Sequence, residues 1–374
     1  MEITTFDNNQ FMSRALSLAK QGRFTTSPNP NVGCVIVHNS EVVGEGFHCK
    51  TGEAHAEIYA LQMAGDRANG ATAYVTLEPC SHYGNTPPCA DALISSGIRR
   101  VVVAMQDPNP QVAGRGLIKL KQAGIEVLHG VLMDEAEQLN RGFLKRMRTG
   151  FPYVQLKLAA SLDGRTALAS GKSKWITSRQ ARQDVQNFRA QASAILTTSS
   201  TVLADNPFLN VRWIDFDPQL QNLYPKDSLR QPIRIVLDRH NQVKPEHFVT
   251  KLDGKCWLIR PNPIYQNWCG DVEQIAIPTD EKGIDLVLLM MQLAKCNINL
   301  IWVESGPTLA AALLTLGLVD ELIVYIAPKI LGGTARELIN IPAIQKLKDA
   351  PAFEFINIEL ISPDLRLTLR PCLN

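Results

Sequence analysis

The first 150 positions carry apolar and polar residues in short blocks with two different spacings. Apolar residues three or four positions apart predict helices at residues 7–20, 55–64, 89–96, 116–123 and 133–147. Compact apolar runs predict strands at residues 32–37, 41–47, 73–77, 100–105 and 125–129, the first two as a hairpin. Because helices and strands alternate, we expect a sheet that is covered by helices on both faces.

The segment Gly150-Phe151-Pro152 interrupts this pattern and predicts a linker. We therefore expect two domains, residues 1–149 and 150–374, which suits a chain of 374 residues. In the second domain, strands are predicted at residues 153–159, 194–198, 233–237, 255–259, 299–303 and 322–326, and helices at residues 178–190, 283–294 and 308–316. Residues 205–231 are rich in proline and aspartate, which is typical of a segment that carries binding residues.

The charge of the chain argues against an extended nucleic-acid surface. Its 38 Lys and Arg residues stand against 36 Asp and Glu residues, and the first 150 positions hold 14 of each kind. Neither domain is basic, so we expect a small-molecule substrate. The polar N-terminus lacks a secretory leader pattern, the apolar runs are too short to cross a membrane, and the scattered cysteines favour reduced thiols. These features predict a cytoplasmic protein.

Three short motifs in the first domain supply the ligands of one metal site. His55-Ala56-Glu57 is followed by Pro79-Cys80, and Cys89 lies nine positions after Cys80. A histidine and two cysteines leave a fourth zinc position for water, which is the pattern of a catalytic site. The order H-x-E…P-C is the signature of zinc-dependent nucleobase deaminases, although their cysteines are spaced C-x-x-C and these are spaced C-x8-C.

The chemistry that this motif predicts is hydrolytic loss of ammonia from an aminopyrimidine-like ring. Zinc lowers the pKa of a bound water to about 7, and Glu57 would carry the proton to a ring nitrogen and then to the departing amine. A structural zinc pair, or buried thiols beside an unrelated histidine, would not account for Glu57 two residues after His55. His82 either lines the pocket or only shapes the loop between the cysteines.

Long blocks in both domains closely resemble the bifunctional deaminase–reductase family of riboflavin biosynthesis. In the first domain these blocks are SPNPNVGC (27–34), GEAHAE (52–57), GATAYVTLEPCSHYGNTPPCADAL (70–93) and QDPNPQVAGRGL (106–117). In the second domain they are QLKLAASLDGR (155–165), SGKSKWITS (170–178), TVLADNP (201–207) and WVESGPTLAAALL (302–314). The resemblance covers nearly the whole chain and is therefore more specific than the zinc signature alone.

The resemblance implies two consecutive reactions. An N-terminal cytidine-deaminase-like α/β/α sandwich would remove the 2-amino group of a diaminopyrimidinone that carries a ribosylamino 5′-phosphate. A C-terminal α/β domain, similar in fold to dihydrofolate reductase, would use NADPH to reduce the ribosyl chain to ribityl. The resemblance also implies Zn²⁺ and NADPH as cofactors, and a homo-oligomer formed through the reductase domain.

The same resemblance implies the residues of each site. His55, Cys80 and Cys89 would bind zinc, with Glu57 as the proton donor. Asn29 and Asn31 would shape the pyrimidine pocket. The NADP contacts would be Ala159, Trp175, Thr201, Asp205 and the run Gly306, Pro307, Thr308, Leu309, Ala310, Ala311 and Ala312. The substrate contacts of the reductase would be Ser173, Arg189, Leu209, Arg212 and Glu304. Asn85 stands where the family commonly has arginine, which affects a charge-assisted contact near the deaminase substrate and not the zinc chemistry.

The residues of the second domain also make chemical sense by themselves. Ser305 would cap a helix that begins near Pro307, and the free N–H groups of such a helix start suit cofactor phosphates. Arg189 and Arg212 could hold a substrate phosphate by bidentate hydrogen bonds, although each alone would indicate only a surface ion pair. Without the resemblance, Trp175 would be interpreted as a residue that packs in the protein and not as one that stacks on a cofactor. No side chain is an obvious acid–base catalyst, and hydride transfer needs mainly alignment, so Asp205 and Glu304 are expected to act as polar orienters.

Two other functions stay open from the sequence. A deaminase that acts on a base within tRNA or DNA shares the zinc signature, but the near-zero charge of the first domain and the large α/β extension argue against it. A zinc-stabilised binding protein whose second domain senses a nucleotide would not need Glu57 beside an open metal site.

Overall fold

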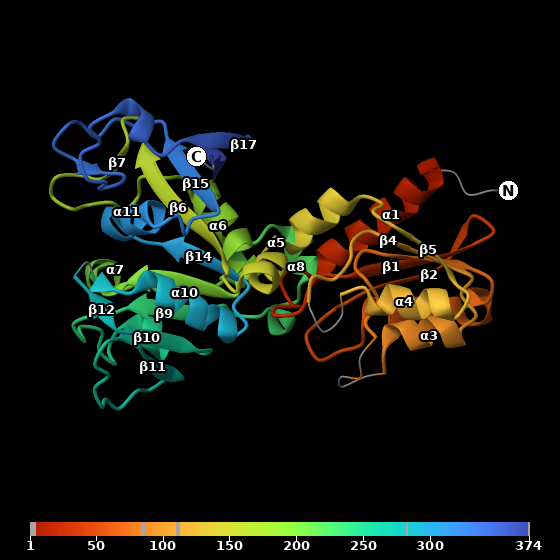
Figure 1. Cartoon of the computed structure of the whole chain (residues 1–374). Coiled ribbons are helices and arrows are strands. Elements are labelled where there is room, and N and C mark those ends of the chain that lie inside the picture. The colour runs from red at the N-terminus through yellow and green to blue at the C-terminus, as the bar shows by residue number, and fades with distance from the viewer. Residues whose placement is uncertain (1–4, 82, 84–86, 110–112, 282, 373–374) are drawn as a thin grey trace. The chain divides into compact units, whose positions relative to one another are not determined.

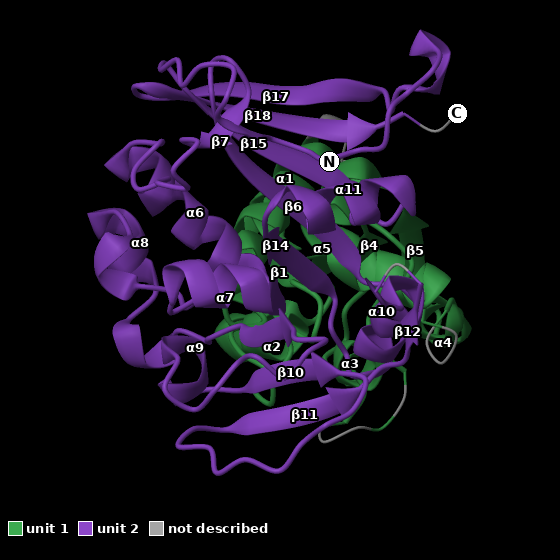
Figure 2. Cartoon of the chain, turned by 90° about the vertical axis from the view of Figure 1, so that its left-hand side faces the viewer, with its two compact units in different colours: residues 1–150 green, residues 151–374 purple. Residues whose placement is uncertain are grey.

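The computed structural model describes residues 5–81, 83, 87–109, 113–281 and 283–372. The chain forms two compact units, residues 1–150 and 151–374, which Figure 2 shows in different colours. Each unit is built on its own β-sheet, with the elements labelled in Figure 1. Among the helices of the described ranges, none is both long enough and apolar enough to span a bilayer.

The first unit contains a five-stranded sheet in the order β2-β1-β3-β4-β5. β1 (Gly33–His38) forms an antiparallel hairpin with β2 (Glu41–Phe47) and also pairs antiparallel with β3 (Thr72–Val75). β4 (Arg100–Val103) and β5 (Glu126–His129) continue the sheet parallel to β3. The carboxyl ends of β3 and β4 therefore meet at one edge of this sheet.

Different helices cover the two faces of the first sheet. Alternation along β1 sends Cys34 and Ile36 into one apolar cluster and Val35 and Val37 into another. The first cluster also contains residues of α2 (Ala56–Ala64), α3 (Cys89–Ser95) and α4 (Arg115–Gln122), and the second contains residues of α1 (Thr5–Ala19) and α5 (Met133–Thr149). The first unit is therefore an α/β/α sandwich, as predicted.

α2 lies close to the hairpin because β2 carries glycine at two contact points. A Cβ atom at Gly44 would lie 2.1 Å from the carbonyl oxygen of Ala60, and one at Gly46 would lie 2.4 Å from that of Ala56. Any side chain at these positions would push the helix away. This contact fixes the first turn of α2, whose N-cap residue is His55.

The second unit contains a nine-stranded sheet in the order β11-β10-β9-β8-β14-β6-β15-β18-β17. The strands are β6 (Tyr153–Ser161), β8 (Ala194–Thr198), β9 (Ile233–Leu237), β10 (Cys256–Arg260), β11 (Val272–Ala276), β14 (Leu300–Glu304), β15 (Glu321–Ala327), β17 (Phe353–Ile361) and β18 (Asp364–Pro371). Neighbours from β11 to β15 are parallel, and β18 and β17 extend the sheet antiparallel. The carboxyl ends of the parallel strands share one edge, where ligands bind in open α/β sheets.

Helices also cover both faces of the second sheet. α10 (Leu286–Lys295) and α11 (Pro307–Thr315) contribute to the apolar cluster on one face, and α6 (Arg179–Gln191) and α7 (Ser199–Asp205) to that on the other. The shorter elements are α8 (Pro218–Leu223), α9 (Phe248–Lys251), β7 (Arg165–Ala167) paired with β16 (Arg336–Glu337), and β12 (Thr279–Asp280) paired with β13 (Gly283–Ile284). Single 3-10 turns lie at Lys20–Gly22, Gly65–Ala68, Trp213–Asp215, Lys226–Ser228 and Leu347–Asp349.

Several regions differ from the prediction, and some of these differences have a clear local reason. The helix predicted at residues 283–294 begins at Leu286, because Asp285 Oδ1 caps it by accepting from the Leu288 N–H at 2.9 Å. The unassigned segment 205–231 contains α8, which Asp217 caps. β17 was not predicted, because a bulge between Phe355 and Asn357 interrupts its period-two pattern. β18 was also missed, although Leu365, Leu367 and Leu369 alternate regularly along it.

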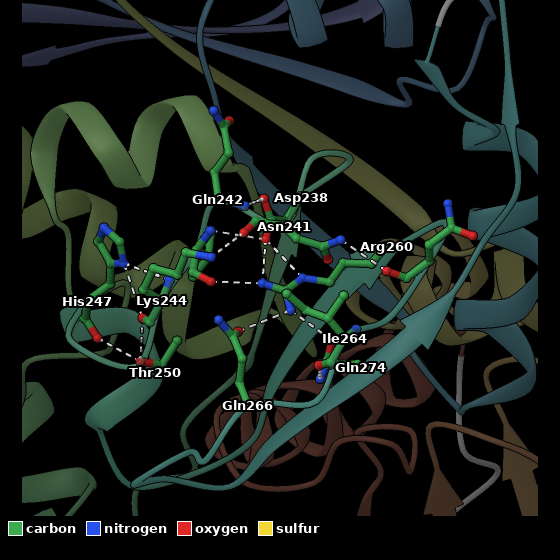
Figure 3. Close-up of polar contacts among 12 residues, drawn as sticks. Asp238, Asn241, Gln242, Lys244, His247, Thr250, Arg260, Ile264, Gln266 and Gln274 are labelled. Atoms are coloured by element: carbon green, nitrogen blue, oxygen red, sulfur yellow. Dashed lines mark hydrogen bonds and ion pairs between the residues drawn. The ribbon is translucent and has the colours of Figure 1, made fainter.

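A buried ion pair joins the carboxyl ends of β9 and β10 (Figure 3). Arg260 donates from Nε at 2.9 Å and from Nη2 at 2.7 Å to Asp238 Oδ2, and both side chains are 0% exposed. Asp238 also accepts from the backbone N–H groups of Gln242 and Val243 at 2.8 and 3.1 Å. Arg260 donates further to the Val243 carbonyl at 2.8 Å and to Gln274 Oε1 at 2.7 Å. The pair therefore fixes the turn that follows β9.

Candidate active sites

The predicted zinc ligands come together from three separate parts of the first unit. His55 is the N-cap of α2, Cys80 follows β3, and Cys89 is the first residue of α3. His55 Nδ1 lies 3.2 Å from Cys89 Sγ and 3.6 Å from Cys80 Sγ, and the three ligand atoms lie within 4.8 Å of one another. One imidazole nitrogen and two sulfur atoms at this spacing fit tetrahedral zinc with a fourth position for water.

A hydrogen bond between the two thiols gives them opposite pKa shifts. The bond from Cys89 lowers the pKa of Cys80, and the same bond raises the pKa of Cys89. The backbone N–H of Cys89 also donates to Cys80 Sγ at 3.3 Å. The lowered pKa of Cys80 favours its thiolate, which is the form that binds a metal.

Glu57 lies in the first turn of α2, two residues after His55, and only 3% of its surface is exposed. Burial raises the pKa of its carboxyl to about 7. A carboxyl that exchanges its proton near neutral pH suits a general acid and base. Within the described ranges, the metal-ligand cluster contains only His55, Cys80 and Cys89, so Glu57 stays available for proton transfer.

Glu78 places the loop that carries Cys80, and the sequence analysis did not single it out. Its carboxylate accepts from the backbone N–H groups of Asp107 at 3.2 Å, Gly114 at 2.9 Å and Gly116 at 2.9 Å. Only 4% of the residue is exposed. These bonds tie the segment before Cys80 to the start of α4. A glutamate between a buried strand and the Pro-Cys motif was the available signal.

His48 is a second residue of this site that the sequence analysis missed. It is 3% exposed, and its ring lies edge-on to that of His55 with centroids 5.6 Å apart. Nδ1 lies 3.1 Å from the Ala54 carbonyl oxygen and therefore carries the proton, so Nε2 accepts from the Asn29 amide at 3.1 Å. Burial lowers the pKa of the ring, which agrees with this neutral form. An isolated histidine after a strand has no pattern that marks it.

The two asparagines predicted to shape the pyrimidine pocket make different contacts. Asn29 is connected to the metal cluster through His48. The backbone of Asn31 exchanges two hydrogen bonds with the Asn140 side chain at 2.7 and 2.9 Å, and Asn31 Oδ1 accepts from Thr26 at 2.9 Å. Asn31 thus holds the loop before β1 against α5. The other two residues considered near this site, His82 and Asn85, lie outside the described residues.

In the second unit, the predicted substrate residues Arg189 and Glu304 form a bidentate ion pair. Arg189 Nε and Nη2 donate to the two Glu304 oxygens at 2.6 and 2.9 Å, and Arg189 Nη1 donates to the Asn210 carbonyl at 2.9 Å. Glu304 Oε1 also accepts from the Trp302 indole at 2.8 Å. The pair joins α6 to the carboxyl end of β14.

Lys157 on β6 adds a second positive charge beside this pair, and the sequence analysis missed it. It lies directly across from Glu304 in the β14–β6 register. Burial alone would raise the pKa of Glu304, but Arg189 and Lys157 hold it at about 2. Burial lowers the pKa of Lys157, and Glu304 opposes that change. A lysine inside an apolar strand was the signal that could have identified it.

The other predicted substrate residues also lie near α6. Arg212 is ion-paired with Asp215, and its backbone N–H donates to Gln186 Oε1 on α6 at 2.9 Å. Leu209 precedes Asn210, whose carbonyl accepts from Arg189, and it is only 3% exposed, so it offers little free surface to a ligand. The structure therefore brings Arg189, Arg212 and Leu209 to one side of α6.

Of the predicted NADP residues, Thr201 and Asp205 follow the carboxyl end of β8, and the Gly306–Ala312 segment follows that of β14. Thr201 lies in the first turn of α7, where its N–H donates to Thr198 Oγ1 at 3.4 Å. Asp205 ends α7, and Lys174 Nζ lies 3.6 Å from its Oδ1. This ion pair links the segment that carries Ser173 and Trp175 to the end of α7. Ala159 lies in the last half of β6.

The N-terminus of α11 is open, but not in the way predicted. Gly306 is the N-cap, Pro307 is the first helical residue, and no side chain caps the helix. The predicted cap by Ser305 is wrong, because its hydroxyl donates to the Gly306 carbonyl at 3.4 Å. Gly306 and Thr308 are exposed, whereas the run Leu309, Ala310 and Ala311 is buried and Ala312 half-buried. The first turn is thus the part that can receive an anion.

Two family models match this chain. The model described as "Cytidine and deoxycytidylate deaminase zinc-binding region" matches residues 6–105. The model described as "RibD C-terminal domain" matches residues 152–367. Together they cover both units.

Relatives and solved structures match over nearly the full length. Riboflavin biosynthesis protein RibD of Escherichia coli is 64% identical over 359 residues, 96% of this chain and 98% of that protein. The RibD protein of Haemophilus influenzae is 54% identical and covers 96% of each chain. The structure of Acinetobacter baumannii RibD, form 1, has a TM-score of 0.90 at 44% identity and covers 99% of this chain and 100% of that one. A diaminohydroxyphosphoribosylaminopyrimidine deaminase/5-amino-6-(5-phosphoribosylamino)uracil reductase from Thermotoga maritima has a TM-score of 0.86 at 32% identity, covering 98% and 99%.

Proposed function

The chain belongs to the RibD family of riboflavin biosynthesis and combines a zinc-dependent deaminase with a reductase that uses NADPH; we propose its substrate and the residues that act on it. The first domain, residues 1–149, deaminates 2,5-diamino-6-ribosylamino-4(3H)-pyrimidinone 5′-phosphate. The second domain, residues 150–374, then reduces the ribosyl chain to ribityl. The observation that carries the proposal is the cluster of His55, Cys80 and Cys89 with Glu57 buried beside it.

In the deaminase, zinc held by His55, Cys80 and Cys89 would supply a water of lowered pKa. Glu57 would move both protons of the attacking water in turn, the first to the ring nitrogen and the second to the amine, which leaves as ammonia. A carboxyl with a pKa of about 7 can accept and release a proton at neutral pH. Asn29, whose amide donates to the neutral His48 ring, would bind the polar edge of the pyrimidine.

In the reductase, NADPH would supply the hydride, and the protein aligns the two reactants. The cofactor is held by Ala159, Trp175, Thr201, Asp205 and the first turn of the Gly306–Ala312 segment. The substrate is held by Ser173, Leu209, Arg189, Arg212 and Glu304. Glu304 keeps Arg189 in place through two hydrogen bonds, and Lys157 leaves this group with a surplus positive charge that suits a phosphorylated substrate.

We also propose that two copies associate through β17 of the reductase domain. β17 is the edge strand of the nine-stranded sheet, and Phe355, Ile358 and Leu360 are 60%, 58% and 68% exposed. An exposed apolar edge strand is unusual on a monomer, and a second copy would cover it. Sedimentation should show a dimer for the wild type and a monomer for the Ile358→Lys, Leu360→Lys variant. A wild-type monomer at micromolar concentration contradicts this assembly.

A coupled assay with a Glu57→Gln variant tests the function. Wild-type protein, given the diaminopyrimidinone phosphate and NADPH, should release ammonia and consume NADPH. The variant should lose ammonia release by about 10²–10⁴-fold, the usual contribution of a general acid–base group. It should therefore consume no NADPH from this substrate.

The already deaminated substrate provides the control for this assay. With it, Glu57→Gln should oxidise NADPH at the wild-type rate, because the second unit is untouched. Removal of zinc with a chelator should give the same pattern as the variant. If zinc-loaded wild type released no ammonia and consumed no NADPH, the proposed substrate would be wrong.

A further inference from the structure

Trp175 is an exposed indole that rests on an arginine. The residue is 62% exposed, and the guanidinium carbon of Arg182 lies 4.3 Å from the centroid of its ring. A guanidinium over an aromatic face is attracted by the electron density of the ring. This contact restrains the indole while most of its surface stays accessible to a ligand.

Two cations also hold the backbone on which Trp175 stands. Lys329 Nζ donates to the carbonyls of Trp175 and Ile176 at 3.0 and 2.8 Å. Arg182 Nη1 donates to the next carbonyl, that of Thr177, at 2.8 Å. This segment belongs to no helix or strand, so its carbonyl groups have no partners from regular backbone pairing. The long side chains of Lys329 and Arg182 bind three successive carbonyl groups instead.

Arg182 also shares a face of α6 with substrate residues. Arg182, Gln186 and Arg189 are spaced i, i+4 and i+7, which places them on one side of the helix. Gln186 Nε2 donates to the Arg182 carbonyl at 3.4 Å, and Gln186 Oε1 accepts from the Arg212 N–H at 2.9 Å. Burial and then the charge of Arg212 lower the pKa of Arg182. The support of Trp175 thus lies between the proposed cofactor and substrate sites.

We propose that Arg182 and Lys329 are positioning residues for NADPH, which fix the Trp175 indole as a platform against which the cofactor packs. Arg182 orients the ring, and Lys329 fixes the backbone that carries it. This inference rests on the proposed contact between Trp175 and NADPH. It goes beyond that contact, because it explains how an exposed side chain outside any regular element is held ready for the cofactor.

The test measures NADPH binding without turnover. Energy transfer from tryptophan to bound NADPH gives the dissociation constant, and all five tryptophans lie after residue 150, so the signal comes from the second unit. Arg182→Ala should weaken NADPH binding about fivefold, as expected for loss of a cation–π contact, and Arg182→Lys should recover part of it. Lys329→Met should weaken binding in the same direction. Arg179→Ala, on the exposed first residue of α6, is the matched control and should bind normally.

A double-mutant cycle with Trp175→Ala separates positioning from a general structural effect. In the Trp175→Ala background, Arg182→Ala should cause no further loss of NADPH affinity. If Trp175→Ala weakened binding but Arg182→Ala did not, or if Arg182→Ala acted equally in both backgrounds, the positioning role would be overturned. If Trp175→Ala itself left affinity unchanged, the proposed cofactor contact would fail and this inference with it. Circular dichroism melting checks that each variant is folded.

Discussion

Two of the arginine–carboxylate pairs described in the second unit include residues at the carboxyl ends of parallel strands, and their surroundings differ. Arg260 and Asp238 join β10 to β9, with both side chains 0% exposed. Arg189 and Glu304 join α6 to β14, with side chains 10% and 18% exposed. Both arginines donate two hydrogen bonds to their carboxylate. The chemical pair is the same, so the difference in role must come from its neighbours.

Neighbouring protein groups satisfy the remaining hydrogen-bonding capacity of the Arg260–Asp238 pair. The neighbours of the Arg189–Glu304 pair instead add a positive charge that is not balanced. Asp238 accepts two further backbone N–H groups, and Arg260 donates to a carbonyl and a glutamine (Figure 3). Beside Arg189 and Glu304, Lys157 adds a positive charge that no second carboxylate in the pair balances. A saturated pair fixes the backbone, and a pair with a surplus cation can bind an anion.

Breaking the saturated pair should cost the most stability. Arg260→Met introduces an uncharged, apolar side chain of similar length. It leaves the Asp238 carboxylate buried without its counter-charge, which should lower the free energy of unfolding by about 3–5 kcal/mol. The urea midpoint should fall by about 1–2 M at a typical dependence on denaturant. Tryptophan fluorescence reports this transition for the second unit alone, since the first 150 residues contain no tryptophan.

Arg239→Met is the matched control for this experiment. Arg239 directly follows Asp238, is exposed, and makes no hydrogen bond or ion pair with the residues that the structure describes. Its replacement should change stability by about 0.5 kcal/mol or less. Equal urea midpoints for Arg260→Met and Arg239→Met would show that the buried pair does not stabilise the fold.

The sequence did not reveal the buried pair, although it contained a signal. Asp238 and Arg260 each directly follow an apolar run that was predicted as a strand, residues 233–237 and 255–259. Nothing local shows that these two strands lie side by side, yet Leu237 and Ile259 are paired in register. Opposite charges at the ends of successive predicted strands would have suggested the contact.

Replacing Glu304 should affect reduction more than stability. Glu304→Gln keeps the shape but removes the charge that holds Arg189 and faces Lys157. Loss of a charged hydrogen bond predicts a decrease of about 10–100-fold in kcat/KM for reduction, mainly through the substrate KM. Ammonia release is the internal control and should stay at the wild-type rate. Unchanged reduction kinetics would remove Glu304 from the substrate site.

The deaminase site shows which functional residues a sequence can reveal. His55, Cys80, Cys89 and Glu57 were predicted because their residue types and order carry the chemistry, and the structure brings the three ligands within 4.8 Å of one another. His48 and Glu78 were missed because their roles depend on partners distant in sequence, such as Asn29 and the backbone of Gly114. The predicted family, both fold classes, both activities and the zinc and NADPH cofactors are confirmed, whereas the individual site residues stay predictions.

The smallest effect should be a pH dependence of stability that comes from the Arg189–Glu304 pair. Arg189 and Lys157 hold the pKa of Glu304 at about 2, below its ordinary value of 4.5. A carboxylate with a lowered pKa stabilises the fold fully above its ordinary pKa and loses this contribution as the pH falls toward 2. The urea midpoint of wild type should therefore exceed that of Glu304→Gln at about pH 6, and the gap should narrow toward about pH 3. A gap that stayed constant over this range would mean that the charge of Glu304 does not stabilise the fold, and that the Arg189–Glu304 pair serves the ligand alone.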